Sequence, residues 1–549
     1  MNRFSDFVRR HAVLLAAYAV WAAAALAFFL LILRETGGHF IYNLDDAYIH
    51  LAIAKHIARN GIWGVTQYAF SSSSSSILWP LLLAAAFRVF GDREILPFLF
   101  VLAASAGLIA VLYREWTSRG SRPAWVMGML IGWMLVFPLG PILFNGMETM
   151  LQALAAVAFS AAAVRFLSGA KSGSLAALCI LAALTAAVRY EGCFIVAAIC
   201  LLLALRGRWK AAFWVGLSAA LPVVLYGTYS VSQGWSFLPN SLLIKHSGVE
   251  WTDPAALWNM AARPFQPVTD IDLLHLPVWQ SLAVVLLVML LIRARSEPKI
   301  EFWDARILPA VIFLLAAVMH SMWITVEMFY RYQAYLNALG IWAVGCLGLP
   351  AVNLAGLRRN AAASAAAACA AALMVIPIAT LAFQAVWKTP AASRNIWQQQ
   401  YQMGLFLRQY YPQETVAAND IGAIDYLSDI HLVDLFGLAS RRVLQAKFGG
   451  EWQRDLAGAL ETIAAAEDVR IAVIYDNWFG YNPETGAAAV PARWIRVADW
   501  TIPGNVVCGG ATVTWYAVQA EEAVRLRSAL EEFAAALPAA VDVRYYPFP

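Results

Sequence analysis

The chain has 549 residues, of which 61% are hydrophobic and only 13% charged, and its mean hydropathy is +0.62. This apolar content exceeds what one soluble core can bury, so it excludes an ordinary water-soluble globule and indicates a polytopic membrane protein. Residues 1–389 hold 27 Lys and Arg against 17 Asp and Glu, whereas residues 390–549 hold 12 against 18. A basic excess in the apolar part is typical of membrane topology and anionic-lipid contact, and it predicts no nucleic-acid partner.

The apolar runs predict eleven spanning helices. The first, at about 12–33, follows a basic flank and is too long for a signal-peptide core. The others lie at about 94–113, 124–143, 148–164, 174–188, 192–205, 211–230, 280–292, 307–325, 333–350 and 361–386. Basic residues cluster in alternate connections, beginning with Arg3, Arg9 and Arg10, which predicts a cytoplasmic N-terminus.

The first outer loop, 34–93, contains a shorter apolar segment at 77–90. Counting this segment as a span would invert every later loop, so we expect an interfacial or re-entrant helix on the outer face. The six serines 71–76 precede it. They are open to two interpretations, a flexible linker or a loop beside a ligand, and we favour a flexible or ligand-adjacent loop.

Residues 390–549 change character and predict a compact α/β domain on the outer side, after a transmembrane domain of residues 1–389. Short β-rich runs such as "ETVAAND", "IHLVDLFG", "VRIAVIYDN" and "TVTWYAVQ" alternate with helical stretches such as "AEEAVRLRSALEEFAAAL". Cys508 is the one cysteine of this part, so no internal disulfide forms there, and no Cys/His metal spacing occurs in the sequence.

Two adjacent carboxylates, Asp45 and Asp46, stand in "IYNLDDAYIH" within the first outer loop. The residues after them predict an amphipathic helix on the membrane surface, with Ile49, Ile53 and His56 on its apolar stripe. One aspartate is expected near the N-cap of that helix, but a cap leaves its neighbour unexplained. The pair therefore suits a general base beside a metal-binding or phosphate-orienting carboxylate.

Further ionisable residues recur in the turns on the same predicted side. They are Glu148, Arg189, Glu191, Lys245, His246, Glu327 and Arg331, with Tyr332 next to the last. Single charges at helix ends commonly extend to water, which is the structural alternative for each of them. Four such groups opposite one Asp-Asp loop indicate a functional site.

The motifs "DDAYIHLAIAKHIARNGIW", "SSSILWPLLLAAAFRVFG", "GMETMLQALA", "AALTAAVRYEG", "LPNSLLIKH" and "NDIGAIDYLSDIHLVDLFGLA" together resemble the GT-C superfamily of polyprenyl-phosphate-sugar glycosyltransferases. The resemblance covers most of the chain in the expected order. It is strongest to the group of terminal arabinofuranosyltransferases and more distant to protein O-mannosyltransferases and lipid A aminoarabinose transferases. Tyr190 stands where many relatives have Pro, and Ile77 also replaces a Pro.

The resemblance implies a GT-C fold with about 11 transmembrane helices, surface helices in the first outer loop and a C-terminal soluble α/β domain. It also implies a multi-pass protein of the bacterial inner membrane, whose active site and C-terminal domain are periplasmic. The implied partners are membrane lipids, a polyprenyl-phosphate-sugar donor, with D-arabinofuranose as the candidate sugar, and a glycan, lipid or protein acceptor. The alternative is a transporter or flippase of lipid-linked sugars.

For an inverting transfer we expect Asp45 to be the base and Asp46 to support it or bind a divalent ion, although the two roles are interchangeable on sequence grounds. The candidates for binding the donor phosphate are Arg189, Lys245, His246, Arg331 and Tyr332. Supporting or acceptor-binding candidates are Glu148, Glu191 and Tyr48. Asp46, Glu148 and Glu191 are candidate ligands for Mg, Mn or Ca, and no organic cofactor is expected. Asp420, Asp425 and Asp434 lie near predicted strand ends, where carboxylates commonly cap loops.

Overall fold

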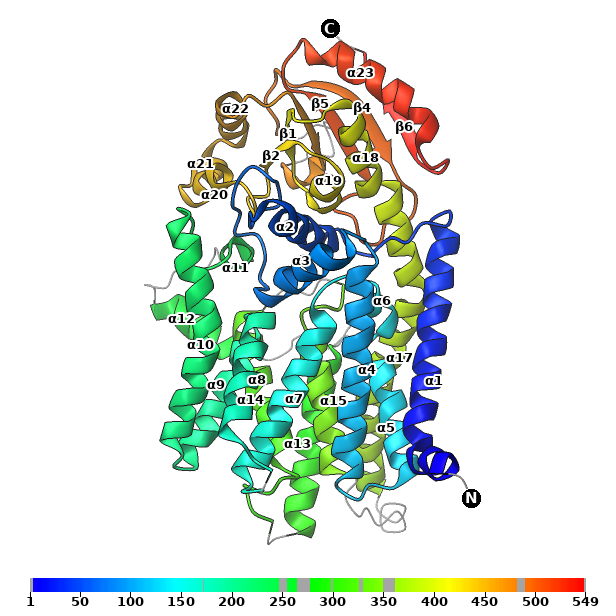
Figure 1. Cartoon of the computed structure of the whole chain (residues 1–549), viewed down its shortest axis with the longest axis vertical. Helices are drawn as coiled ribbons and strands as arrows, with labels where there is room; N and C mark the ends of the chain where they lie inside the picture. The colour runs from blue at the N-terminus through cyan, green and yellow to red at the C-terminus, as the bar shows by residue number, and fades with distance from the viewer. Residues whose placement is uncertain are drawn as a thin grey trace.

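A computed structural model describes residues 3–170, 172–245, 254–263, 277–297, 300–324, 329–348, 361–480 and 489–547. A bundle of long helices forms one end of the molecule and a mixed sheet with its helices forms the other (Figure 1). Two further helices lie across the molecule between these parts (Figure 1). Helix α1 begins at the end of the bundle farthest from the sheet.

Each of the eleven predicted apolar runs overlaps a helix of the bundle. These helices are α1 (Arg3–Glu35), α4 (Leu96–Thr117), α5 (Pro123–Val136), α7 (Thr149–Leu167), α8 (Leu175–Val188), α9 (Gly192–Leu205), α10 (Trp209–Ser232), α13 (Val278–Ser296), α14 (Leu308–Trp323), α15 (Ala334–Leu347) and α17 (Ala361–Gln398). Short helices α6 (Leu139–Leu143), α11 (Asn240–Lys245) and α12 (Pro254–Ala262) accompany them. The run at 124–143 is divided between α5 and the short helix α6.

Among the described residues, five helices are long and apolar enough to cross a membrane: His11–Glu35, Leu96–Thr117, Thr149–Leu167, Trp209–Ser232 and Val278–Arg295. The number of eleven spans therefore stays a prediction. Helix α10 exposes Trp209, Phe213, Trp214, Leu217 and Leu221. An apolar face of this size is unfavourable in water and indicates contact with lipid, so the chain has the character of a multi-pass membrane protein.

The first loop carries α2 (Asp46–Asn60) and α3 (Leu78–Phe90), which confirms both predicted helices. The expectation that α2 buries only one stripe is wrong, because Ala47 to Ala54 are all buried. Helix α3 packs on α2 from one side and the C-terminal domain packs on it from another. Even Lys55, which lies off the apolar stripe, donates from Nζ to the carbonyl oxygen of Tyr426 at 2.6 Å. Helix α2 is thus an internal element and does not rest on a surface.

The C-terminal part is built around a six-stranded sheet in the order β2-β1-β3-β5-β4-β6. The strands are β1 (Thr415–Ala418), β2 (His431–Asp434), β3 (Ile471–Ile474), β4 (Ile495–Thr501), β5 (Thr512–Ala517) and β6 (Asp542–Tyr545). Strand β1 pairs in parallel with β2 and β3, whereas the β3–β5, β5–β4 and β4–β6 pairs are antiparallel. The predicted runs correspond to β1, β2, β3 and β5, while β4 and β6 were not predicted.

Helices cover both faces of this sheet, which suits the continuous apolar run "IAVI" of β3. The helical elements are α18 (Gln400–Tyr410), α19 (Gly422–Leu427), α20 (Arg441–Phe448), α21 (Glu451–Arg454), α22 (Leu456–Ala466), α23 (Glu522–Phe533), η2 (Asp476–Trp478) and η3 (Ala534–Ala536). On one face, Phe406 of α18 and Phe533 of α23 pack with Trp500 and Trp515. Helix α17 continues past the predicted domain boundary at 389/390 to Gln398. The predicted architecture of an apolar helical bundle, helices in the first loop and a C-terminal α/β domain is confirmed.

Candidate active site

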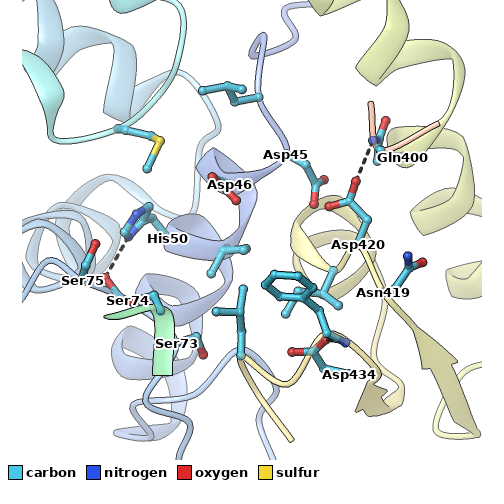
Figure 2. A pocket seen from close by; sticks show the side chains of 18 of the residues that line it. Asp45, Asp46, His50, Ser73, Ser74, Ser75, Gln400, Asn419, Asp420 and Asp434 are labelled. Carbon is cyan, nitrogen blue, oxygen red and sulfur yellow. Dashed lines mark hydrogen bonds between the residues drawn. The ribbon is translucent and has the colours of Figure 1, made fainter. Parts of the chain in front are cut away.

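A cavity of about 460 Å³ lies where the first loop, the bundle turns and the C-terminal domain meet (Figure 2). The loop contributes Asp45, Asp46, His50 and Ser73–Ser75 to the wall. The bundle side contributes Met147, Arg189, Ser241, Arg331 and Tyr332. The C-terminal domain contributes Gln400, Asn419, Asp420, Asp434, Phe436 and Trp478. Three segments far apart in the sequence therefore build one chamber.

The two adjacent aspartates point to different sides of this cavity (Figure 2). Asp45 occupies the N-cap position of α2, but its carboxylate makes no cap bond to that helix. Instead its oxygens accept the backbone N–H groups of Gly422 at 2.6 Å and Ala423 at 2.8 Å. The expected cap on α2 is thus a cap on α19, in the other domain. Gly422 is required there, because a Cβ on it would lie 2.0 Å from the carbonyl oxygen of Asp45.

Asp45 faces a second carboxyl group, Asp420, which follows β1 (Figure 2). Burial raises the pKa of Asp45 well above its usual range, and the neighbouring Asp420 raises it further, while the two N–H bonds from α19 oppose the shift. Gln400 donates from Nε2 to Asp420 Oδ2 at 2.9 Å and also to the hydroxyl of Tyr475 at 2.9 Å. These surroundings therefore favour the protonated form of the Asp45 carboxyl group.

Asp46 points toward the bundle, where it forms an ion pair with Arg331. Arg331 also donates to the hydroxyl of Tyr332 at 3.0 Å, contacts Met147 Sδ at 3.3 Å, and lies 4.8 Å from the centre of the Tyr332 ring. The Asp46 side chain is 29% exposed, against 6% for Arg331. The geometry places a guanidinium and a phenol beside the cavity, with a carboxylate that fixes the guanidinium in position.

Arg189 is held by two glutamates. Its Nε and Nη2 donate to Glu191 at 3.0 and 2.6 Å, and its Nη1 donates to Glu148 at 2.7 Å. Glu148 is fully buried and Arg189 is 2% exposed. A phosphate could reach Arg189 only by competing with carboxylates already paired in a desolvated site. The structure thus places Arg189 at the cavity wall, with its charge more than balanced by protein groups.

The other predicted residues are less directly placed. Tyr48 is fully buried, its hydroxyl accepts the N–H of Tyr42 at 3.3 Å, and it packs against Tyr401 and Tyr426, away from the residues that line the cavity. Lys245 ends α11, but its side chain, like all of His246 and Glu327, lies outside the described residues.

The predicted metal ligands do not fit a divalent ion as they are arranged. Asp46 is paired with Arg331, and both Glu148 and Glu191 are paired with Arg189. Within the described part of the chain, no group of three or more His, Cys, Asp or Glu residues is placed to hold a metal. The three carboxylates that the sequence indicated as metal ligands are thus divided between two arginines, Asp46 with Arg331 and the two glutamates with Arg189.

The serine run is an ordered part of the wall. All six serines are at most 9% exposed. Ser72 Oγ is 3.0 Å from the hydroxyl of Tyr226, its carbonyl accepts the N–H of Asn240 at 2.8 Å, and Ser76 Oγ accepts the N–H of Trp79 at 3.1 Å. The serine run is therefore not a flexible loop. It lies beside the cavity, where Ser73–Ser75 form part of the wall.

His50 was not among the predicted site residues. It lies one turn after Asp46 in α2, with Nδ1 3.4 Å from Ser74 Oγ and Nε2 3.4 Å from Glu148 Oε2. Burial lowers its pKa, and Arg189 contributes in the same direction, whereas Glu148 opposes them, so the ring is neutral at physiological pH. The i, i+4 spacing from Asp46 was the signal that could have placed it on the same helix face.

The strand-end aspartates divide by role. Asp420 lines the cavity, together with the preceding Asn419. The carboxylate of Asp434 accepts the N–H groups of Phe436 at 2.8 Å and Ala439 at 2.7 Å, so it shapes its own loop. Asp425 is 2% exposed, does not line the cavity, and its carboxyl oxygens have no hydrogen-bond partner among the described residues.

Glu94, which immediately follows the first loop, gives a pH prediction. Burial raises its pKa to about 7, while the hydroxyl of Tyr401, 3.1 Å from Oε1, opposes the shift. Because the pKa is higher in the folded state than in the unfolded state, stability should fall as pH rises from about 4.5 to 7. Glu94→Gln should remove this loss and stabilise the protein at pH 8 by up to about 3 kcal/mol.

Thermal unfolding of the detergent-solubilised protein, followed by tryptophan fluorescence at pH 5 and pH 8, measures this effect. The melting temperature of Glu94→Gln should exceed that of wild type at pH 8 and approach it at pH 5. Asp92→Asn, on the same segment but at the protein surface beside Arg59, is the control and should show no such trend. A difference that grows toward acid pH would contradict the assignment.

A family model described as "Domain of unknown function (DUF8728)" matches residues 394–518, within the C-terminal part. No curated protein matches the chain. Two solved structures of ArnT from Cupriavidus metallidurans are similar over 92% of this chain and 98% of theirs. The apo structure has 13% sequence identity and a TM-score of 0.46, and the structure bound to undecaprenyl phosphate has 14% and 0.44. Similarity at this level transfers neither a substrate nor a residue role to this chain.

Proposed function

We propose that this chain is an inverting glycosyltransferase of the GT-C type, which moves a sugar from a polyprenyl-phosphate donor to an acceptor hydroxyl. The observation that carries the proposal is the arrangement of the cavity: two facing carboxyl groups, Asp45 of the first loop and Asp420 of the C-terminal domain, share it with an Arg–Tyr pair on the bundle side. A transfer from a lipid phosphate needs both a base for the acceptor proton and a cation for the leaving phosphate.

The bundle side suits the donor. Arg331 can contact phosphate oxygens through a planar guanidinium, and Tyr332 adds a hydroxyl donor. Leu44, Ile49, Ile244 and Ile396 also line the cavity and offer an apolar surface to the first units of a prenyl chain. Asp46 keeps Arg331 in place before the donor arrives.

The reaction is a single displacement. Asp45 takes the proton of the acceptor hydroxyl as its oxygen forms a bond to the anomeric carbon. The bond from that carbon to the phosphate oxygen breaks, and its electron pair leaves with the polyprenyl phosphate, which Arg331 stabilises. One displacement from the face opposite the phosphate inverts the anomeric centre.

The finer assignment is a D-arabinofuranose donor and a cell-envelope glycan, lipid or protein acceptor at the periplasmic face of a bacterial inner membrane. It is supported by the likeness of the sequence motifs to the arabinofuranosyltransferase group. A flippase or transporter is less well supported, because such proteins place their ionisable groups near the bilayer midplane. Here α2, which begins at Asp46, lies at one end of the bundle, next to the sheet domain (Figure 1).

The test is release of polyprenyl phosphate from a panel of polyprenyl-phosphate sugars, including the arabinofuranose donor, by the purified full-length protein. Arg331→Lys keeps a charge but loses the planar fork, so kcat/KM for the donor should fall by about 10²–10³-fold. Arg408→Lys, on the outer helix α18, is the matched control. Absence of release from every donor by wild type, or full activity of Arg331→Lys, would count against the proposal.

A further inference from the structure

The C-terminal domain does more than cover the cavity, because its parallel strands direct their carboxyl ends into it. Asn419 and Asp420 follow β1, Asp434 ends β2, and η2 with Trp478 follows β3. All four side chains line the cavity. In open α/β sheets the crevice outside the carboxyl ends of parallel strands is where ligands bind. Here the first loop supplies the opposite wall of that crevice.

Asp420 holds a specific position in this crevice. Its Oδ2 accepts a hydrogen bond from Gln400, and its carboxyl group faces that of Asp45 (Figure 2). Asp45 is fixed in turn by the N–H groups of Gly422 and Ala423, which directly follow the Asp420–Ile421 dipeptide. Asp45 is buried and Asp420 is half-buried, and two carboxyl groups that face each other at such a site repel strongly when both are ionised.

We propose that Asp420 is a positioning residue of the C-terminal domain that shares one proton with Asp45, so that the two carboxyl groups act as one acid–base unit. This inference rests on the proposed function. The singly protonated pair accepts the proton of the acceptor hydroxyl and becomes neutral, and it then releases one proton to water in the cavity. The proton taken up and the proton released balance over a turnover, and no further reactant is needed.

Other ionisable groups near Asp45 do not replace Asp420 in this role. Tyr475 and Cys508 approach from β3 and from the connection between β4 and β5, and burial raises the pKa of both well above their usual ranges, so both are neutral. Asp46 is turned toward Arg331 on the other side of the cavity. Asp420 is therefore the carboxyl group with which Asp45 can share a proton.

The test is the pH profile of polyprenyl phosphate release by the full-length protein. Asp420→Asn should lower kcat by about 10- to 100-fold with little change in KM for the donor, since only the base is altered. The acidic limb reports protonation of the singly charged pair, in which Asp420 is neutral and donates its proton to Asp45. Losing that hydrogen bond in Asp420→Asn should move the acidic limb of the kcat profile to higher pH by about one unit. Asp420→Glu should recover part of the rate. An unmoved limb would overturn the proposal.

Asp425→Asn is the matched control. Asp425 allows the same Asp-to-Asn change five residues beyond Asp420 in the sequence, and it does not line the cavity. Burial raises its pKa well above the usual range, so the variant keeps a neutral group at that site. The acidic limb of Asp425→Asn should match that of wild type, and a shift equal to that of Asp420→Asn would overturn the proposal.

An infrared titration separates this inference from the proposed function, because it needs no substrate. In pH difference spectra, Asp45→Asn and Asp420→Asn should each abolish or shift the same protonated-carboxyl band, whereas Asp425→Asn should alter a different one. If wild type released no polyprenyl phosphate, the proposed function would fail. The titration would still show whether Asp45 and Asp420 share a proton. A band of Asp45 unchanged in Asp420→Asn would overturn the shared proton.

Discussion

Asp45→Asn should lower the rate of sugar transfer by about 10²–10⁴-fold, the range over which a general base contributes. The amide cannot take the acceptor proton, yet its oxygen can still accept one of the two N–H bonds from α19. The site should therefore remain assembled, and the loss should fall on kcat with donor binding largely kept. The measurement is steady-state release of polyprenyl phosphate, together with binding of polyprenyl phosphate alone.

Asp46→Asn is the informative comparison for the same experiment. Asp46 contacts Arg331, which the proposal assigns to the leaving phosphate, so this variant should act mainly on donor affinity and on kcat/KM. Asp46→Asn should thus raise KM, whereas Asp45→Asn should lower kcat. The reverse pattern would exchange the two roles, and full activity of both variants would remove the base from this loop.

The bundle and most of the sheet domain were predictable because their signals are local. Apolar runs and alternating patterns report burial directly, so the eleven helices and strands β1, β2, β3 and β5 were located from the sequence. Strands β4 and β6 were missed. The "IRVADWT" of β4 mixes charged and apolar residues, and the exposed edge strand β6 shows little burial.

The direction of each site side chain could not be predicted in the same way. Asp45 and Asp46 are neighbours in the sequence and look equivalent there. The start of α2 turns Asp45 toward α19 and Asp46 toward Arg331. Helix α2 looked amphipathic because the polar residue Lys55 lies off its apolar stripe. In the structure Lys55 donates to a carbonyl of the C-terminal domain, a contact that no local sequence pattern reports. The serine run likewise looked flexible, although its hydroxyls are held by Tyr226 and by its own backbone.

Arg189 illustrates why residue type alone did not identify the phosphate ligand. An arginine at the outer end of a helix has the right chemistry for a phosphate, but Glu148 and Glu191 occupy its donors in this fold. Arg331 has the same chemistry, and Asp46, the carboxylate that pairs with it among the described residues, is partly exposed at the cavity. The difference depends on which acidic groups the tertiary structure brings within reach, and the sequence contains both glutamates without indicating that they pair.

Arg189→Met should therefore destabilise the protein and not simply weaken donor binding. The substitution leaves Glu148 and Glu191 buried without their cation, which costs about 3–5 kcal/mol when a buried pair is broken from one side. The expected result is a clear fall in the melting temperature of the detergent-solubilised protein, and a lower yield of folded protein, measured by tryptophan fluorescence and size-exclusion chromatography.

The matched control is the triple variant Arg189→Met, Glu148→Gln, Glu191→Gln. Neutralising the whole cluster removes the uncompensated charges, so much of the lost stability should return, since replacing an entire buried ionic group is often close to neutral. If instead Arg189→Met melted like wild type but lost its affinity for polyprenyl phosphate, Arg189 would be a ligand of the donor phosphate. The two glutamates would then serve to hold that ligand ready, as Asp46 does for Arg331.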